Sequence, residues 1–280
     1  MPYEPHHEFP EPEDDDQTIW RYLEFPQLLS ILERESLWFT AANGFEDPYE
    51  GSFTMPDLEE AVEKALAMEW DIEEEEFMQM VQSTPDHFLN NLFLNCWHMN
   101  DYESAAMWAQ YSPADGGIAV CSTIDRFKDA LNSCEEYDVH LSPVDYVDFR
   151  EDVIREAYVP RRFLYKRKSY EHEKELRAVV HLQDVIEVET SVAQQKGLNV
   201  RCPDKAIQQY PRMEPYASML GEELPPGLHV PVDLDILIDM IYVAPDAPDW
   251  LEETVDEITD TYGLGSAKVK KSSLKSELLK

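Results

Sequence analysis

The densest cluster of basic side chains lies at residues 161–168, which hold five bases and no acid. Clustered arginines with aromatic neighbours suit a bound phosphate or carboxylate, because a guanidinium forms bidentate, charge-assisted hydrogen bonds. The same bases can instead form ion pairs with the many acids of the chain, which is the more frequent role of a charge cluster. On the ligand-binding interpretation, Lys166 and Arg167 are expected to contact an anion.

Two carboxylates follow this basic cluster. If the segment that starts at Glu173 is extended, the two-residue period of a strand places Glu173, Glu175 and Arg177 on one face. Neighbouring carboxylates repel each other, which raises the pKa of one and separates them into acid and base, while a nearby arginine keeps the other ionised. If the segment is helical, Glu171 and Glu175 share a solvent-exposed face instead. The apolar run that follows favours the strand.

A thiol and an imidazole lie two residues apart in Cys96-Trp97-His98, with Glu103 just beyond. They form an incomplete zinc set, since no second pair of suitable spacing exists, and we predict no metal site. A Cys–His nucleophile pair would need a third, orienting group, because neighbours on one strand face are poorly placed for proton transfer. We therefore favour a buried Cys96 and a hydrogen-bonded His98. The sequence contains no P-loop, GxGxxG, GxSxG or HExxH motif.

Longer motifs occur in a fixed order between residues 18 and 182. They are Trp20-Arg21-Tyr22, Phe45-x-Asp47-Pro48-Tyr49-Glu50-Gly51, Cys96-Trp97-His98-Met99-Asn100-x-x-Glu103-Ser104-Ala105-Ala106-Met107-Trp108, Gly117-Ile118-Ala119-Val120 and Phe163-Leu164-x-Lys166-Arg167-Lys168-Ser169-Tyr170-Glu171-His172-Glu173-x-Glu175-Leu176-Arg177. In this order they resemble the family called domain of unknown function 2971, which is found in bacteria and salt-loving archaea. That resemblance brings no settled activity.

Part of the pattern is also similar to the Arg–Ser–Glu order of the ADP-ribosyltransferases. Arg21 lies on a first expected strand, Ser122 ends a central one, and Glu173 and Glu175 form a late pair. This resemblance implies an enzyme that uses NAD or a phosphorylated ligand, in a defence setting. Arg21 would hold the pyrophosphate, Ser122 would order the pocket, Glu175 would stabilise the oxocarbenium-like sugar and Glu173 would orient the acceptor. The remaining expected ligand-binding residues are Tyr22, His98, Glu103, Lys166, Arg167 and Arg177.

Two alternatives belong to other functional classes. A non-catalytic binding or regulatory module would use the same charged residues to recognise an anionic small molecule without turning it over. A metal-dependent nuclease would take its carboxylates from Asp47, Glu50, Glu173 and Glu175, but a strongly acidic surface disfavours the approach of DNA. A test for NAD hydrolysis separates the enzyme from the binding module.

The 280-residue chain is strongly acidic, with 58 Asp and Glu against 23 Lys and Arg and a net charge of −35. Such a surface repels phosphate backbones and anionic lipids, so nucleic-acid and membrane partners are disfavoured. No apolar run approaches the ~18 residues of a transmembrane helix. The first residues also lack the basic and apolar regions of a signal peptide. We therefore expect a cytoplasmic protein with free, buried cysteines.

This acidity indicates a halophilic protein, the alternative being an ordinary protein kept soluble by its surface charge. Residues 1–267 hold 18 bases and 57 acids. Molar salt reduces the Debye length to ~3 Å, which screens their mutual repulsion. We therefore predict that the thermal midpoint climbs steadily from dilute to molar KCl. A flat or falling curve would leave only the solubility explanation.

Short strands and helices must position these side chains. Strands are expected over residues 18–23, 37–40, 93–98, 117–122, 144–147, 176–182 and 236–243, and helices over 26–36, 57–81, 103–111, 126–131 and 250–262. Their irregular alternation, without a βαβ period, predicts an α+β fold with a central mixed or antiparallel sheet and flanking helices.

Three segments lie outside this pattern and leave one domain over residues 18–265. Residues 1–17, rich in proline and acids, predict a disordered acidic arm. Residues 190–230 predict an irregular excursion, and residues 266–280 a basic C-terminal tail. Because the polar clusters lie at the ends of expected strands, we expect Arg21, residues 47–50, residues 98–103 and residues 166–177 to meet in one pocket.

Overall fold

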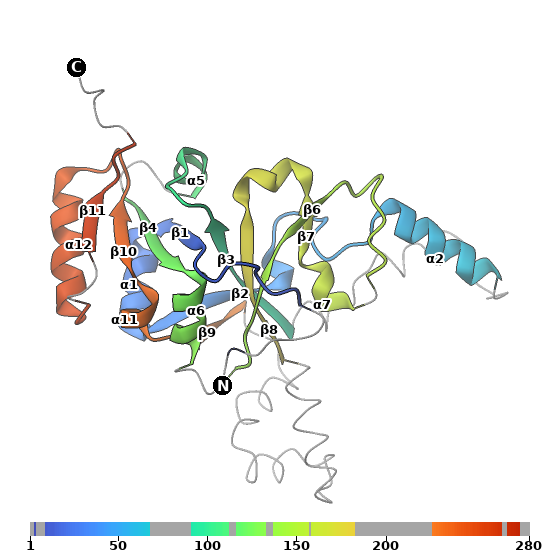
Figure 1. Cartoon of the computed structure of the whole chain (residues 1–280), viewed down its shortest axis with the longest axis horizontal. Coiled ribbons are helices and arrows are strands. Elements are labelled where there is room, and N and C mark those ends of the chain that lie inside the picture. The colour runs from blue at the N-terminus through green and yellow to red at the C-terminus, as the bar shows by residue number, and fades with distance from the viewer. Residues whose placement is uncertain are drawn as a thin grey trace, which may run out of the picture.

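The computed structural model describes residues 3, 9–67, 91–111, 116–132, 137–156, 158–182, 226–264 and 268–274. Within these ranges, helices surround a large mixed sheet, which confirms the α+β class (Figure 1). The strands of that sheet are β1 Thr18–Glu24, β2 Ser36–Ala41, β3 Leu92–Met99, β4 Gly117–Thr123, β5 His140–Pro143, β8 Glu175–His181, β9 Gly227–Pro231, β10 Met240–Val243 and β11 Lys268–Lys271. A second, small sheet pairs β6 Asp145–Val147 with β7 Tyr165–Arg167.

Helices lie along the sheet and at its ends. Their bounds are α1 Phe25–Arg34, α2 Met55–Ala67, α5 Ala105–Tyr111, α6 Ile124–Leu131, α7 Val159–Arg162, α11 Leu234–Leu237 and α12 Asp249–Thr261, with 3-10 turns η1 Ala42–Gly44 and η2 Lys168–Glu173. Figure 1 shows α2 projecting from one end of the molecule and α12 beside β11 at the other. Among the helices in the described ranges, none is long and apolar enough to cross a membrane.

The order of the strands explains how the sheet opens. Neighbours follow the order β11-β10-β4-β1-β3-β2-β9, and all pairs are antiparallel except β10 with β11. β8 pairs with one edge of β3 over residues 92–98, and β5 pairs with β8. The opposite edge of β3 is shared, since β1 pairs there only at residues 98 and 99 and β2 only at 93 and 94. β1 and β2 therefore diverge along this edge, and residues 95–97 of β3 face an opening.

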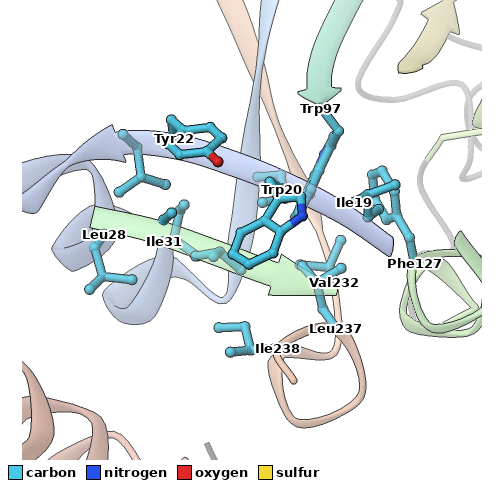
Figure 2. Packing of buried hydrophobic residues seen from close by; sticks show 14 of the residues in the cluster. Ile19, Trp20, Tyr22, Leu28, Ile31, Trp97, Phe127, Val232, Leu237 and Ile238 are labelled. Atoms are coloured by element: carbon cyan, nitrogen blue, oxygen red, sulfur yellow. The ribbon is translucent and has the colours of Figure 1, made fainter. Parts of the chain in front are cut away.

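The hydrophobic core forms where apolar faces of β1, β3 and β4 meet the helices. Ile19, Trp97 and Phe127 are buried and lie close together in Figure 2, and the rings of Trp97 and Phe127 are 5.1 Å apart. Leu28 and Ile31 contribute the inner face of α1. Burying such side chains stabilises the fold by about 1.5–3 kcal/mol each, so this core fixes the position of β1 relative to β3.

The start of α1 follows from local sequence. Glu24 and Gln27 form a capping box, with the Gln27 side chain accepting a hydrogen bond from the Glu24 backbone N–H at 2.8 Å. Pro26 occupies the first turn, where no backbone N–H is needed. α1 therefore begins immediately after β1 and turns the chain back toward β2.

Two expected strands differ in the structure. The apolar run at 236–243 is split, because Asp233 accepts a hydrogen bond from Ile236 N at 3.1 Å and caps the short helix α11, so that β10 begins only at Met240. The strand expected at 144–147 is β6, which lies in the small sheet, and the strand of the large sheet at this point is β5, just before it. An apolar run alone does not distinguish a buried strand from a buried helical turn.

The segments outside the expected domain are also partly ordered. Phe9, from the expected disordered arm, is buried and stacks on His140 with ring centroids 5.2 Å apart, and Lys128 forms an ion pair with Asp15 at 2.7 Å. The described part of the arm is therefore attached, because its single apolar ring finds a partner. In the expected tail, residues 268–271 form β11. Most of the 190–230 excursion and the expected helix beyond residue 67 lie outside the described residues.

Candidate functional site: a cleft at the split in the sheet

A cleft of about 990 Å³ lies at the divergence of β1 and β2. Its walls come from β1, β2 and β3, from α1 and α5, and from the segment of β7, η2 and β8. Among the expected site residues, the ones that line it are Arg21, Tyr22, His98, Lys166, Glu173 and Glu175. Residues more than 150 positions apart in the sequence thus meet in one cleft, although Arg21 lies within β1 and Glu173 in η2, not at strand ends.

Arg21 lies at the point where the two strands part. The last β1 residue that pairs with β3 is Trp20, and the Arg21 guanidinium reaches across the opening to donate a hydrogen bond from Nη1 to Cys96 O at 2.7 Å. Within the described residues it makes no ion pair. Burial lowers the pKa of Arg21, yet a guanidinium stays charged in proteins. Among the described residues, this cation of the cleft therefore has no carboxylate partner.

Asn95 closes the other side of the opening. Its Nδ2 donates to Trp38 O on β2 at 2.8 Å, and its Oδ1 accepts from Trp97 Nε1 at 2.7 Å. Asn95 and Arg21 thus provide side-chain hydrogen bonds where a continuous sheet would have backbone pairs. These two hydrogen bonds, one on each side, stabilise the divergence of β1 and β2.

Deeper in the cleft, three carboxylates surround one ammonium. Lys166 Nζ donates to Glu173 Oε2 at 2.5 Å and to Glu175 Oε2 at 3.1 Å, and it lies 3.7 Å from Glu50 Oε1. These glutamates were candidate metal ligands, but the Lys166 ammonium stands at their centre. The described residues include no group of three or more His, Cys, Asp and Glu arranged to hold a metal ion.

Arg177 lies behind this cluster and is completely buried. Its Nε and Nη2 donate to the two oxygens of Glu175 at 2.9 and 3.0 Å, and its Nη1 reaches Glu50 Oε2 and Phe163 O, each at 2.5 Å. Arg177 does not line the cleft. Arg177 therefore holds Glu175 and Glu50 in place. Because it does not line the cleft, the expectation that Arg177 contacts the ligand is wrong.

The charges in this cluster fix the ionisation of Glu175. Burial by itself raises the pKa of Glu175, but Arg177 and Lys166 outweigh it and lower the pKa to about 2. The pKa of Lys166 is raised. Burial by itself would lower it, but the negative charges of Glu175 and Glu173 outweigh burial. Glu175 is therefore a permanent carboxylate at neutral pH. The predicted raised pKa does not apply to Glu175, because two cations, and not a second carboxylate, are its nearest partners.

Glu173 does not lie on the strand. It ends η2, and Lys174, with a φ of 39°, turns the chain before β8 begins at Glu175. Glu173 Oε1 accepts from Gln110 Nε2 at 2.8 Å and from Tyr111 OH at 3.1 Å. Both partners lie at the end of α5 and line the cleft. Sequence reasoning missed them, although two polar residues ending an apolar helix were a weak signal.

The thiol and imidazole of β3 are not a nucleophile pair. Burial raises the pKa of the Cys96 thiol well above its ordinary value, so it stays protonated. His98 Nδ1 lies 2.5 Å from Glu173 O and donates to it, since a carbonyl only accepts. Burial lowers the pKa of His98 and keeps the ring neutral. His98 is a hydrogen-bonded ring, as predicted, whereas Cys96 is only half-buried and the prediction of a buried Cys96 is wrong.

The basic cluster at 161–168 is largely engaged by acids of the chain. Arg161 pairs with Glu156 at 3.2 Å, Arg167 with Asp47 at 3.0 Å, and Lys168 with Asp152 at 2.9 Å. Arg162 lies over the ring of Phe53 and donates to Glu156 O. The ion-pair explanation of this cluster is therefore the one that the geometry supports, and Arg167 is not a lining residue.

Two other expected site residues lie outside the cleft. Ser122 Oγ donates to Leu237 O at 2.5 Å and joins β4 to α11. Glu103 accepts from Trp108 Nε1 at 3.0 Å and supports α5. Neither residue lines the cleft. The expectation that Ser122 orders the pocket is therefore wrong, because Ser122 lies elsewhere in the fold. Their positions in the sequence suggested that both lie near the other site residues, but the order of the strands places them away from the cleft.

The fold and site together define a class of α+β protein in which a split sheet forms a cleft, with a buried ion-pair cluster at its base. No family model matches this sequence, and no curated protein matches it either.

Proposed function

We propose that the cleft binds an anionic small molecule through Arg21, and that the chain is a member of the domain of unknown function 2971 family. The observation that carries the binding proposal is the Arg21 guanidinium, which lines the cleft and makes no ion pair within the described residues. Arg21 is half-buried, and a charge that is partly removed from water with no counter-ion among the described residues is costly. An anionic ligand group would supply such a counter-ion.

The other walls of the cleft suit a ligand of substantial size. Its volume of about 990 Å³ is at the upper end of small-molecule sites. Aromatic rings of Trp38, Phe45 and Tyr170 line it together with polar side chains. Lys166 adds little attraction for an anion, because its charge is already balanced by Glu173 and Glu175. We therefore assign the anion to Arg21.

ADP-ribosyl transfer or NAD hydrolysis is the second candidate function. The specific support is that Glu175, with its pKa lowered to about 2, faces the same cleft as Arg21. A permanent carboxylate there would stabilise positive charge that develops on a sugar ring, while Arg21 holds the pyrophosphate. Because both oxygens of Glu175 are held by Arg177 and Lys166, this role would be electrostatic, without proton transfer.

The test is a calorimetric titration of the full chain with NAD and ADP-ribose, followed by an assay for nicotinamide release. Replacing Arg21 by glutamine should weaken binding roughly 10- to 100-fold, because one charge-assisted hydrogen bond is lost. Lys168→Gln is the matched control, since Lys168 pairs with Asp152 outside the cleft. Equal affinity of the Arg21→Gln variant and the wild type would overturn the anion site. Nicotinamide release would favour the enzyme, and binding without release the non-catalytic module.

A further inference from the structure

We propose that Trp38 is the platform on which a planar aromatic ring of the ligand stacks, so that the ligand of this cleft is a nucleotide. This inference rests on the proposed function, because the phosphate of the same ligand would bind Arg21. Trp38 lines the cleft and leaves 38% of its surface exposed, so its ring is accessible to a ligand in the cleft.

The indole is held in a fixed position. A Cβ added to Gly227 would lie 2.3 Å from Trp38 Cζ2 and 2.5 Å from Cε2, so the ring lies directly against the bare backbone of β9. The His229 ring meets it edge-on at 4.9 Å, and Trp38 O accepts from Asn95 Nδ2. A ring fixed from the backbone and from one edge loses little freedom when a ligand stacks on it.

The platform and the cation flank the same opening. Both side chains line the same cleft, Arg21 on the β1 side of the opening and Trp38 on the β2 side. The Arg21 guanidinium donates to the carbonyl of Cys96, and the backbone carbonyl of Trp38 accepts from the side chain of Asn95, the preceding residue of β3. A ligand that spans the opening can therefore contact both. Stacking on an aromatic ring is tolerant of the base, because every base has a π-face. A planar base joined to a phosphate is the chemistry that these two groups recognise.

The experiment compares AMP with ribose 5-phosphate, which carries the phosphate without the base. We expect Trp38→Leu to weaken AMP binding roughly 10- to 100-fold and to leave ribose 5-phosphate unchanged, while Trp38→Phe keeps most of the AMP affinity. Trp250→Leu is the matched control, because Trp250 is exposed on α12 and does not line the cleft. Thermal melting checks that each variant is folded.

The outcomes separate this inference from the proposed function. Equal AMP affinity of Trp38→Leu and the wild type would overturn the platform, and so would an equal loss for both ligands, which indicates a merely structural role. Binding of ribose 5-phosphate with no gain from the base would also overturn it. If Arg21→Gln leaves the affinity for both ligands unchanged, or if the wild type binds neither, the anion site itself is overturned.

Discussion

Replacing Arg177 by alanine should lower the free energy of unfolding by about 3–5 kcal/mol, the largest effect that we expect from a single substitution in this protein. Arg177 is completely buried and is the counter-ion of two glutamates. Its removal leaves Glu175 with Lys166 alone, leaves Glu50 without its closest cation, and frees the carbonyl of Phe163. Uncompensated buried charge is the physical cause of the loss. Chemical denaturation followed by circular dichroism measures it.

Two further variants control this result. Lys168→Ala removes a neighbouring base whose pair with Asp152 is exposed, and it should change the denaturation midpoint little. Glu175→Gln should also destabilise the protein, because Glu175 is 5% exposed and pairs with two cations. An Arg177→Ala variant as stable as the wild type would contradict the assignment of Arg177 as the structural centre of the site.

Gly51→Ala should also be strongly destabilising, by about 2–4 kcal/mol. Gly51 has a φ of +75°, which an L side chain adopts only under strain, and an added Cβ would lie 2.3 Å from Cζ of Phe163. The Phe163 ring is buried and has no free space to move into. Because Gly51 follows Glu50 and Phe163 O contacts Arg177, the shift would also reach the ion-pair cluster. Thermal melting of the purified variant gives the measurement.

Gly263→Ala separates strain from overpacking. Gly263 has a similar φ of +83°, but a Cβ there meets no atom within 4 Å. It should therefore lose only the backbone contribution, about 1 kcal/mol. Equal effects of the two substitutions would show that the contact between Gly51 and Phe163 contributes nothing to stability.

Local sequence predicted most of the elements that build the cleft. The apolar and β-branched residues of 18–23, 37–40, 93–98 and 117–122 form β1, β2, β3 and β4 close to the expected bounds. Residues 236–243 were harder to assign, because the Asp233 cap places the first part of this mostly apolar run in α11 and only the last part in β10. Glu173 was misplaced for a similar reason. The turn at Lys174 uses a left-handed conformation without a glycine to mark it.

What the sequence determined by itself is the α+β class, the acidity and the set of charged and aromatic groups that the strand ends carry. Only the tertiary structure decided which of these charges remain available. Arg167 is neutralised by Asp47, 120 residues away, whereas Arg21, as far as the described residues go, meets a backbone carbonyl and no acid. Ion pairing depends on three-dimensional neighbours that strand order and register select, and spacing along the chain does not encode them. The cleft likewise exists because β1 and β2 share one edge of β3 and then diverge, which no local pattern specifies.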